Sequence, residues 1–169
     1  MAKCLIENSP LLIPVLTIAK TLCSITKMNE EEIIEIKMYV PDEASTANYD
    51  VIKVSDNRYK LTNNDPFSEI LTYGTIIEVL PEKKKRDGEE IFVFKEIYAE
   101  SEYDLEVIGL PMSLNETEMR VVGQMIMDEG GYWEVIFGGM GYVNLPKNSK
   151  LNVIEELNRL IKAKQKLKK

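Results

Sequence analysis

The segment "EGGYWEVIFGGMGYVNLP", Glu129 to Pro146, decides how the second half of the chain folds. It contains five of the nine glycines of the protein and its only tryptophan. A phosphate-binding loop places its glycines between a strand and the N-terminus of a helix, where free backbone N–H groups face the anion. Here the glycines of the stretch 138–141 are followed by "YVNL", which is typical of a strand. We therefore expect a tight hairpin between two strands and no cradle for a phosphate.

Helices are expected on both sides of this hairpin. Ser113 and Glu116 have the spacing of a capping box, which predicts a helix that ends at the paired glycines of the quoted segment. A second helix is expected from residue 150 to about 164, with Ile154 among its inward-facing side chains. A strand is expected at 103–110. The resulting order, strand–helix–strand–strand–helix, matches five of the six elements of a ferredoxin-like unit.

Short strand patterns dominate the preceding region. They are predicted at residues 31–40, 51–54, 58–61, 75–80 and 89–99. The polar residues 41–50 are expected to form a connection, and the Asp-Gly pair at 87–88 predicts a hairpin turn. The fold class is therefore α+β. An antiparallel, barrel-like sheet in residues 31–99 is followed by the ferredoxin-like half in residues 100–169, which ends in a basic tail, and both are expected in one compact domain.

Residues 1–30 are expected to be a buried N-terminal helix or an extension. The apolar run 11–19 is much shorter than the roughly 20 residues that span a bilayer, and no small-residue cleavage site follows it. Cys4 and Cys23 lie in apolar surroundings and form no metal-binding spacing, which is typical of reduced thiols. We therefore expect a cytoplasmic protein without a membrane segment.

The charge is unevenly distributed along the chain. The formal net charge is −7, yet five lysines and no acids lie between residue 162 and the C-terminus. The rest of the chain has 16 basic against 28 acidic residues, a net charge of −12. Such a body repels nucleic acids and attracts basic surfaces. The partner that we expect is therefore another protein with a basic surface, whereas nucleic acid is disfavoured.

Several kinds of catalysis are excluded by composition. The chain has no histidine, so Ser-His-Asp and Cys-His catalysis and histidine-containing zinc sites are ruled out. Its two cysteines are too few for a four-thiolate site. Carboxylate acid–base chemistry, lysine chemistry and oxygen-ligated metals stay open, but each needs side chains that converge. We expect no catalytic residue, no cofactor and no metal, and we favour a protein that is not an enzyme.

The consecutive basic residues Lys83 to Arg86 are expected at an exposed hairpin tip. Glu82, Glu89 and Glu90 flank them, and no aromatic residue is adjacent in the sequence. A solvated loop is favoured over a nucleic-acid site, because single-stranded nucleic acids are bound by basic grooves that also contain aromatic side chains.

Candidate binding residues come from two polar regions. If Trp133 points into the core, the alternation of a strand turns Glu134 toward solvent, a ligand or the groove beside the sheet. A pocket between the sheet and the helix that follows residue 113 is one hypothesis for a small ligand. The candidate binding residues are Asn64, Asp65, Tyr73, Glu78, Tyr132, Trp133 and Glu134.

The run "RYKLTNNDPFSEILTYGTIIEV" carries a family resemblance. Its Tyr-x-Leu-x-Asn-x-Pro-Phe and Tyr-Gly-x-Ile-Ile-Glu patterns are carried by Tyr59, Leu61, Asn63 or Asn64, Pro66, Phe67, Tyr73, Gly74, Ile76, Ile77 and Glu78. Together with the later glycine-rich segment, this resembles a family of short bacterial proteins that is known as a domain of unknown function. One residue is inserted near Asn64, and Thr75 stands where the family has Asp. The resemblance covers about residues 50 to 160 and implies a shared fold and a bacterial or phage origin, without an activity.

The sequence leaves two functions open. The first is a non-enzymatic, acidic protein-binding module, such as an immunity protein or an inhibitor of a bacterial or phage partner. The alternative is a small-ligand-binding protein or a carboxylate-based enzyme, with its pocket between the sheet and the helix.

Overall fold

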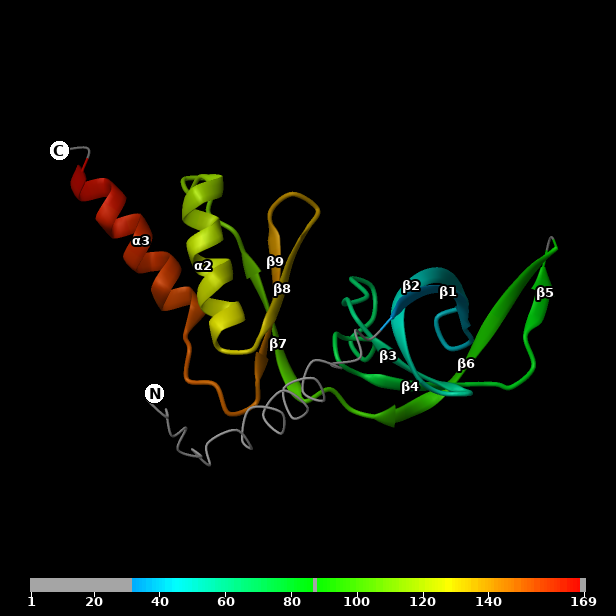
Figure 1. Ribbon diagram of the computed structural model, residues 1–169. Helices are drawn as coiled ribbons and strands as arrows, with labels where there is room; N and C mark the ends of the chain where they lie inside the picture. Colours follow the sequence, from blue (N-terminus) through cyan, green and yellow to red (C-terminus); the bar gives the residue numbers. More distant parts are fainter. Residues whose placement is uncertain (1–31, 87, 168–169) are drawn as a thin grey trace, which may run out of the picture. The chain divides into compact units, whose positions relative to one another are not determined.

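The computed structural model describes residues 32–86 and 88–167, and these form an α+β protein (Figure 1). The expected N-terminal helix or extension, with Cys4 and Cys23, lies outside the described residues. Among the described residues, no helix is long and apolar enough to cross a membrane.

Five strands close into a barrel, and a sixth extends from it. The strands are β1 (Ile33–Val40), β2 (Ser45–Ser55), β3 (Arg58–Leu61), β4 (Ile76–Val79), β5 (Lys84–Arg86) and β6 (Glu89–Ala99). Each of β1, β2, β3, β4 and β6 pairs antiparallel with the next, and β6 pairs back with β1 in parallel. The parallel closure follows from the odd number of strands, because the first and fifth strands of a meander run in the same direction.

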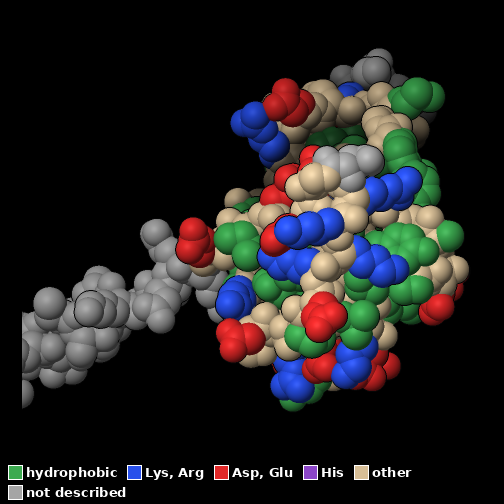
Figure 2. All heavy atoms as spheres, turned by 90° about the vertical axis from the view of Figure 1, so that its right-hand side faces the viewer, with side chains coloured by type: hydrophobic (Ala, Val, Ile, Leu, Met, Phe, Trp, Pro, Cys, Tyr) green, Lys and Arg blue, Asp and Glu red, His purple; other side chains and the backbone are tan. Residues whose placement is uncertain are grey.

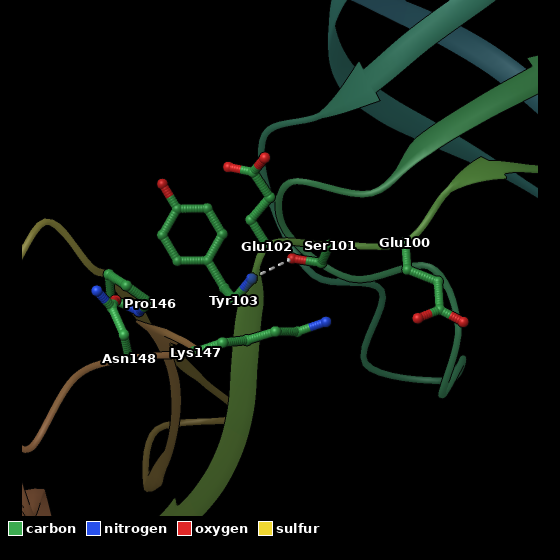
Figure 3. Close-up of a pocket in the computed structure, with 7 residues that line it drawn as sticks. All are labelled: Glu100, Ser101, Glu102, Tyr103, Pro146, Lys147 and Asn148. Carbon is green, nitrogen blue, oxygen red and sulfur yellow. Dashed lines mark hydrogen bonds between the residues drawn. The ribbon is translucent and has the colours of Figure 1, made fainter.

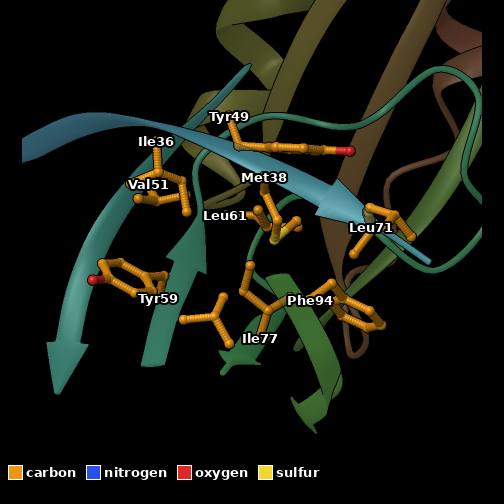
Figure 4. Close-up of a cluster of buried hydrophobic side chains, with 11 residues drawn as sticks. Ile36, Met38, Tyr49, Val51, Tyr59, Leu61, Leu71, Ile77 and Phe94 are labelled. Carbon is orange, nitrogen blue, oxygen red and sulfur yellow. The ribbon is translucent and has the colours of Figure 1, made fainter. Parts of the chain in front are cut away.

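The barrel is filled by alternate side chains of its strands, as strand geometry requires. Figure 4 shows most of the cluster, which contains Ile36, Met38, Val40, Tyr49, Val51, Tyr59, Leu61, Leu71, Ile77, Val79 and Phe94. Met38 and Leu61 are fully buried. All of these residues lie between Ile36 and Phe94, so none of them comes from the second half of the chain.

Two boundaries in the barrel differ from the sequence-based expectation. The segment expected as a polar connection contains the first residues of β2, which begins at Ser45 opposite Val40 of β1. Pairing with β1 overrides the low strand preference of "STAN". The basic run expected at a loop tip forms the short strand β5, which pairs with the first residues of β6.

The second half of the described chain is a three-stranded sheet with two helices. Its elements are β7 (Tyr103–Gly109), α2 (Glu116–Asp128), β8 (Tyr132–Ile136), β9 (Met140–Pro146) and α3 (Val153–Leu167). The sheet order is β7-β9-β8, with both pairings antiparallel. Both helices lie on one face of the sheet (Figure 1), and the core between them contains Ile108, Leu114, Val122, Ile126, Val143, Val153 and Leu157.

The glycine-rich stretch is a hairpin turn, as expected. It joins β8 to β9, and the Gly139 N–H donates to the Ile136 carbonyl at 3.4 Å. Phe137 and Gly138 have φ angles of 52° and 71°, which lie in the left-handed region that glycine adopts most easily. The glycines are therefore followed by β9 and not by the N-terminus of a helix.

Both helices differ in detail from the sequence-based expectation. The N-cap of α2 is Asn115, whose side chain accepts from the Glu118 N–H while the Glu118 side chain accepts from the Asn115 N–H. The capping box expected at Ser113 and Glu116 is thus wrong by two residues, since the pattern allows either register. In α3, Ile154 is 46% exposed instead of buried, and Val153 takes its place in the core.

Candidate functional site

The loop between β3 and β4 is joined to β8 through Asn64, which is 4% exposed. The Asn64 side-chain amide donates to Glu134 Oε1 at 2.6 Å, and the Asn64 N–H donates to the same oxygen at 3.0 Å. The Asn64 side-chain oxygen, Oδ1, accepts from the Tyr73 N–H at 3.0 Å. Three of the candidate residues, Asn64, Tyr73 and Glu134, are therefore brought together across a long sequence separation.

Three tyrosine rings pack together beside the hydrogen bonds between Asn64, Tyr73 and Glu134. Tyr73 stacks on Tyr132 with ring centroids 4.3 Å apart and meets the edge of Tyr103 at 5.0 Å. The Tyr132 hydroxyl lies 3.5 Å from Glu134 Oε2. Burial, and then the charge of Glu134, raise the pKa of Tyr132 to about 12. The hydroxyl therefore stays protonated at neutral pH.

Asp65 stabilises the same loop through hydrogen bonds to both of its carboxylate oxygens. Its Oδ2 accepts from the Tyr49 hydroxyl at 2.6 Å, and its Oδ1 accepts from the Phe67 N–H at 2.9 Å. Burial, followed by the hydrogen bond to Asp65, raises the pKa of Tyr49. Because both carboxylate oxygens hold parts of the protein, Asp65 fixes the turn at Phe67.

The glycine of the Tyr-Gly pattern, Gly74, has a structural reason. Its φ angle is 84°, and a Cβ placed there would lie 3.0 Å from the Ser101 hydroxyl and from the Tyr103 ring. The Ser101 hydroxyl in turn donates to the Tyr73 carbonyl at 2.6 Å. The glycine thus allows the loop to approach the beginning of β7 closely.

Glu78 and Trp133 do not join this group. Glu78, on β4, is bound by Arg58 Nε at 2.9 Å and Lys95 Nζ at 2.6 Å, and Lys95 and then Arg58 lower its pKa. Trp133 points to the opposite face of the sheet, where its ring packs against Gly123 of α2. The space between sheet and helix at this point, where a pocket was expected, is filled by the indole ring.

A groove beside β7 lies outside the predicted set. Two adjoining cavities, of about 700 and 490 Å³, share Glu100, Ser101, Tyr103 and Lys147 in their linings. Figure 3 shows the first of these cavities. Ile70, Ile97, Leu105 and Val107 supply apolar walls in the second cavity. Ser101 orients the entry to β7, since its hydroxyl accepts from the Tyr103 N–H at 3.1 Å. We refer to both cavities together as the β7 groove.

Acidic side chains recur at every second residue along the β7 groove. They are Glu100, Glu102, Asp104 and Glu106, all exposed, and we call them the acidic stripe; the first three line the cavities, and Glu106 lies further along β7, outside both linings. None of these carboxylates forms a hydrogen bond or ion pair with another described residue. The alternation is visible in "ESEYDLE", but the sequence cannot show that this segment becomes an outer strand beside a groove.

The metal-binding capacity of the described residues is small. Within residues 32–86 and 88–167, no group of three or more His, Cys, Asp or Glu side chains has the geometry to hold a metal ion. Asp104 and Glu106, the members of the acidic stripe within β7, are consistent with this, because alternate residues of an extended strand lie about 6.6 Å apart and do not converge on one point.

Comparison with known proteins adds little to this geometry. No protein-family model matches the sequence, and no curated protein matches it. A crystal structure of a hypothetical protein from Neisseria gonorrhoeae is similar, with a TM-score of 0.44 and 14% identity over 78% of this chain and 89% of that one.

Proposed function

We propose that the chain is a non-enzymatic protein-binding module that engages a basic partner through the β7 groove. The observation that supports this most directly is the acidic stripe: exposed carboxylates without partners at every second residue, three of which line a groove with apolar walls. Charged side chains that only serve solubility need no such alignment. A partner that supplies cations at the same spacing would pair with each carboxylate in turn.

The backbone of β7 supports the same mode of binding. Among the described strands, β7 pairs with β9 alone, so its other edge presents unpaired N–H and C=O groups. An extended segment can add to such an edge as a further strand, with backbone hydrogen bonds for affinity and side-chain contacts for specificity. Acidic side chains on an edge strand oppose pairing with a second copy of the same acidic strand. The preferred segment is therefore basic and extended.

The groove supplies apolar contact area beside this charged edge. Leu105 and Val107 of β7 face Ile70 of the loop and Ile97 of β6 across the second cavity. Lys147 is the basic residue of the lining, and it adds one local repulsion for a basic partner. Four carboxylates of the linings, Glu69, Glu100, Glu102 and Asp104, outnumber it, so the local field still favours cations.

An immunity protein or an inhibitor is the class of function that this surface fits best. Such proteins act by covering a site on another protein, and a basic nucleic-acid-binding enzyme offers a surface complementary to the acidic stripe. The α/β half, with the strand order β7-β9-β8 and a helix after β7 and after β9, would then be a ferredoxin-like unit that presents its outer strand.

A charge-removal variant tests the proposal. We expect the combination Glu100→Gln, Glu102→Gln, Asp104→Asn and Glu106→Gln to bind an extended peptide of alternating Lys and Val at least about tenfold more weakly. The matched control is Glu35→Gln, Asp42→Asn, Glu82→Gln and Glu155→Gln, which removes the same charge from exposed positions elsewhere. Fluorescence anisotropy at several salt concentrations measures the binding of the peptide to both variants. Equal weakening in the two variants would show a diffuse charge effect and would exclude the β7 groove as the site.

A small ligand in the same groove is the second candidate function. The second cavity, of about 490 Å³, lies within the range of about 300 to 1,000 Å³ that small-molecule sites occupy, and it combines apolar walls with hydroxyl and charged side chains that could orient a ligand. Leu105→Glu would reduce the binding of an apolar ligand, whereas the charge-removal variant would leave it unchanged. A thermal-shift screen with both variants separates the two functions.

A further inference from the structure

A second concave site lies at the β5–β6 hairpin, away from the β7 groove. It is a cavity of about 320 Å³ lined by Tyr39, Thr46, Lys84, Lys85, Arg86 and Ile91. Figure 2 views this side of the protein and shows Lys and Arg side chains gathered near the centre of the face. The basic run thus forms one wall of a cavity and is not a simple loop tip.

The fold brings an aromatic residue into this cavity from a distant strand. Tyr39 of β1 is opposite Thr46 of β2 and Val93 of β6 in the barrel. The β5–β6 hairpin places Lys84 Nζ 4.9 Å from the centre of the Tyr39 ring, a distance at which the ring attracts the ammonium group. No aromatic residue is adjacent to the basic run in the sequence, but barrel closure brings one beside it from a distant strand.

The charges around the cavity are only partly neutralised. Lys37 and Lys83 form ion pairs with Glu89 and Glu90, respectively. Lys84 and Lys85 have no carboxylate within ion-pair distance among the described residues. Lys84 contacts the Tyr39 ring and Lys85 interacts with Glu90 only through its longer-range charge, so neither ammonium group is held in an ion pair. Both can therefore turn to an anion, and the Thr46 hydroxyl in the same lining adds a neutral donor.

We infer that this cavity binds the phosphate group of a small phosphorylated ligand, such as a nucleotide. A phosphate carries close to two negative charges at neutral pH and accepts several hydrogen bonds, which matches two unpaired lysines and a hydroxyl. The ring of Tyr39 offers an apolar contact to the remainder of the ligand. The cavity is at the lower end of the size range of small-molecule sites.

The charge of the whole protein favours a small ligand over a nucleic acid. Outside the lysine-rich C-terminus the net charge is −12, so a long polyanion would be repelled by most of the surface that it crossed. A single phosphate meets only the charges of the cavity. Small phosphorylated ligands and nucleic acids both contain phosphate groups, so probes of different length are needed to distinguish the two classes.

Binding of inorganic pyrophosphate, ATP and a single-stranded oligonucleotide to the full chain tests the inference. Isothermal titration calorimetry should show binding of ATP and pyrophosphate. The double variant Lys84→Gln and Lys85→Gln should raise both dissociation constants at least about tenfold. The matched control Lys150→Gln and Lys162→Gln removes two exposed lysines elsewhere and should leave both constants unchanged. Thermal unfolding checks that both variants are folded.

Three results would overturn the inference. The first is the absence of binding by ATP and pyrophosphate, and the second is equal weakening by the two double variants, which would indicate general charge attraction. The third is an affinity for the oligonucleotide that exceeds that for ATP and increases with its length, which would indicate a nucleic-acid surface. Tyr39→Leu should weaken ATP more than pyrophosphate, because only ATP has a ring that can contact residue 39.

Discussion

Asn64 and Glu134 join the barrel to the α/β half through one carboxylate oxygen, which accepts from the Asn64 side chain at 2.6 Å and from its N–H at 3.0 Å. Asn64 is almost completely buried, so loss of this acceptor leaves two donors without a partner. Glu134 thus has a structural role, and the effect of replacing it on protein stability can be measured separately from any binding function.

Replacement of Glu134 should destabilise the protein in graded steps. We expect Glu134→Gln to lower the free energy of unfolding by about 1 kcal/mol, since the acceptor loses its charge, and Glu134→Ala by about 2 to 3 kcal/mol, since both donors lose their partner. Glu106→Gln, an exposed carboxylate without a partner, should change it by less than about 0.5 kcal/mol. Urea unfolding measures all three, and an Ala variant as stable as the native protein would contradict the contact.

Gly123 should tolerate no side chain, because Trp133 occupies its space. A Cβ at Gly123 would lie 2.4 Å from Trp133 Nε1, which forces the indole ring or α2 to move. We expect Gly123→Ala to destabilise the protein by about 1 to 3 kcal/mol, although alanine favours helix by about 1 kcal/mol. The fluorescence of Trp133, the only tryptophan, should change at the same time.

Gly109→Ala is the control for this prediction. Nothing lies within 4 Å of a Cβ at Gly109, so its substitution should leave both the stability and the fluorescence close to native values. If Gly123→Ala behaves like Gly109→Ala, the packing of Trp133 against α2 is not as the structure has it.

The two registers of the α2 cap can be separated by single substitutions. Asn115→Ala should lower the free energy of unfolding by about 1 kcal/mol, because the Glu118 N–H loses its acceptor. Ser113→Ala should have an effect below about 0.5 kcal/mol, because the exposed Ser113 side chain does not cap α2. Thermal unfolding of both variants decides between them, and a larger effect at Ser113 would favour the register expected from the sequence.

Elements with their own local signal are predictable from the sequence, and elements that depend on a distant partner are not. The alternation in "EEIFVFKEIYA" predicts β6 at residues 89–99, and the glycines after Phe137 predict the β8–β9 turn. By contrast, the start of β2 depends on pairing with β1, and the closure of the barrel depends on Met38 lying beside Phe92. Neither partnership has a signature within one segment.

The candidate site likewise combines features that the local sequence predicts with contacts that it does not. A strand alternation is sufficient to place Trp133 in the core and Glu134 on the other face. It does not reveal that Glu134 is opposite Asn64, which lies 70 residues earlier. The separation of Glu78 from the group follows from its partners Arg58 and Lys95, which come from β3 and β6.

The stability of the protein should decrease in alkaline solution partly because of Tyr132. Burial raises its pKa from 10.0 to about 12. Below pH 10 the hydroxyl is protonated in both the folded and the unfolded chain, so its contribution to stability is complete. Between pH 10 and about 12 the unfolded chain releases the proton while the folded chain keeps it, so the unfolding free energy falls as the pH rises.

Tyr132→Phe should make this decrease shallower, since phenylalanine has no proton to release. Some decrease should persist, because burial also raises the pKa of Tyr49, and its hydrogen bond to Asp65 raises it further. Urea unfolding at a series of pH values measures the slope, and the absorbance of tyrosinate follows the ionisation directly. The curves of the variant and the native protein should run parallel below pH 9, because neither tyrosine titrates there. An unchanged slope above pH 10 would mean that the Tyr132 hydroxyl is as accessible to water as in the unfolded chain, and the stacking on Tyr73 would then be in question.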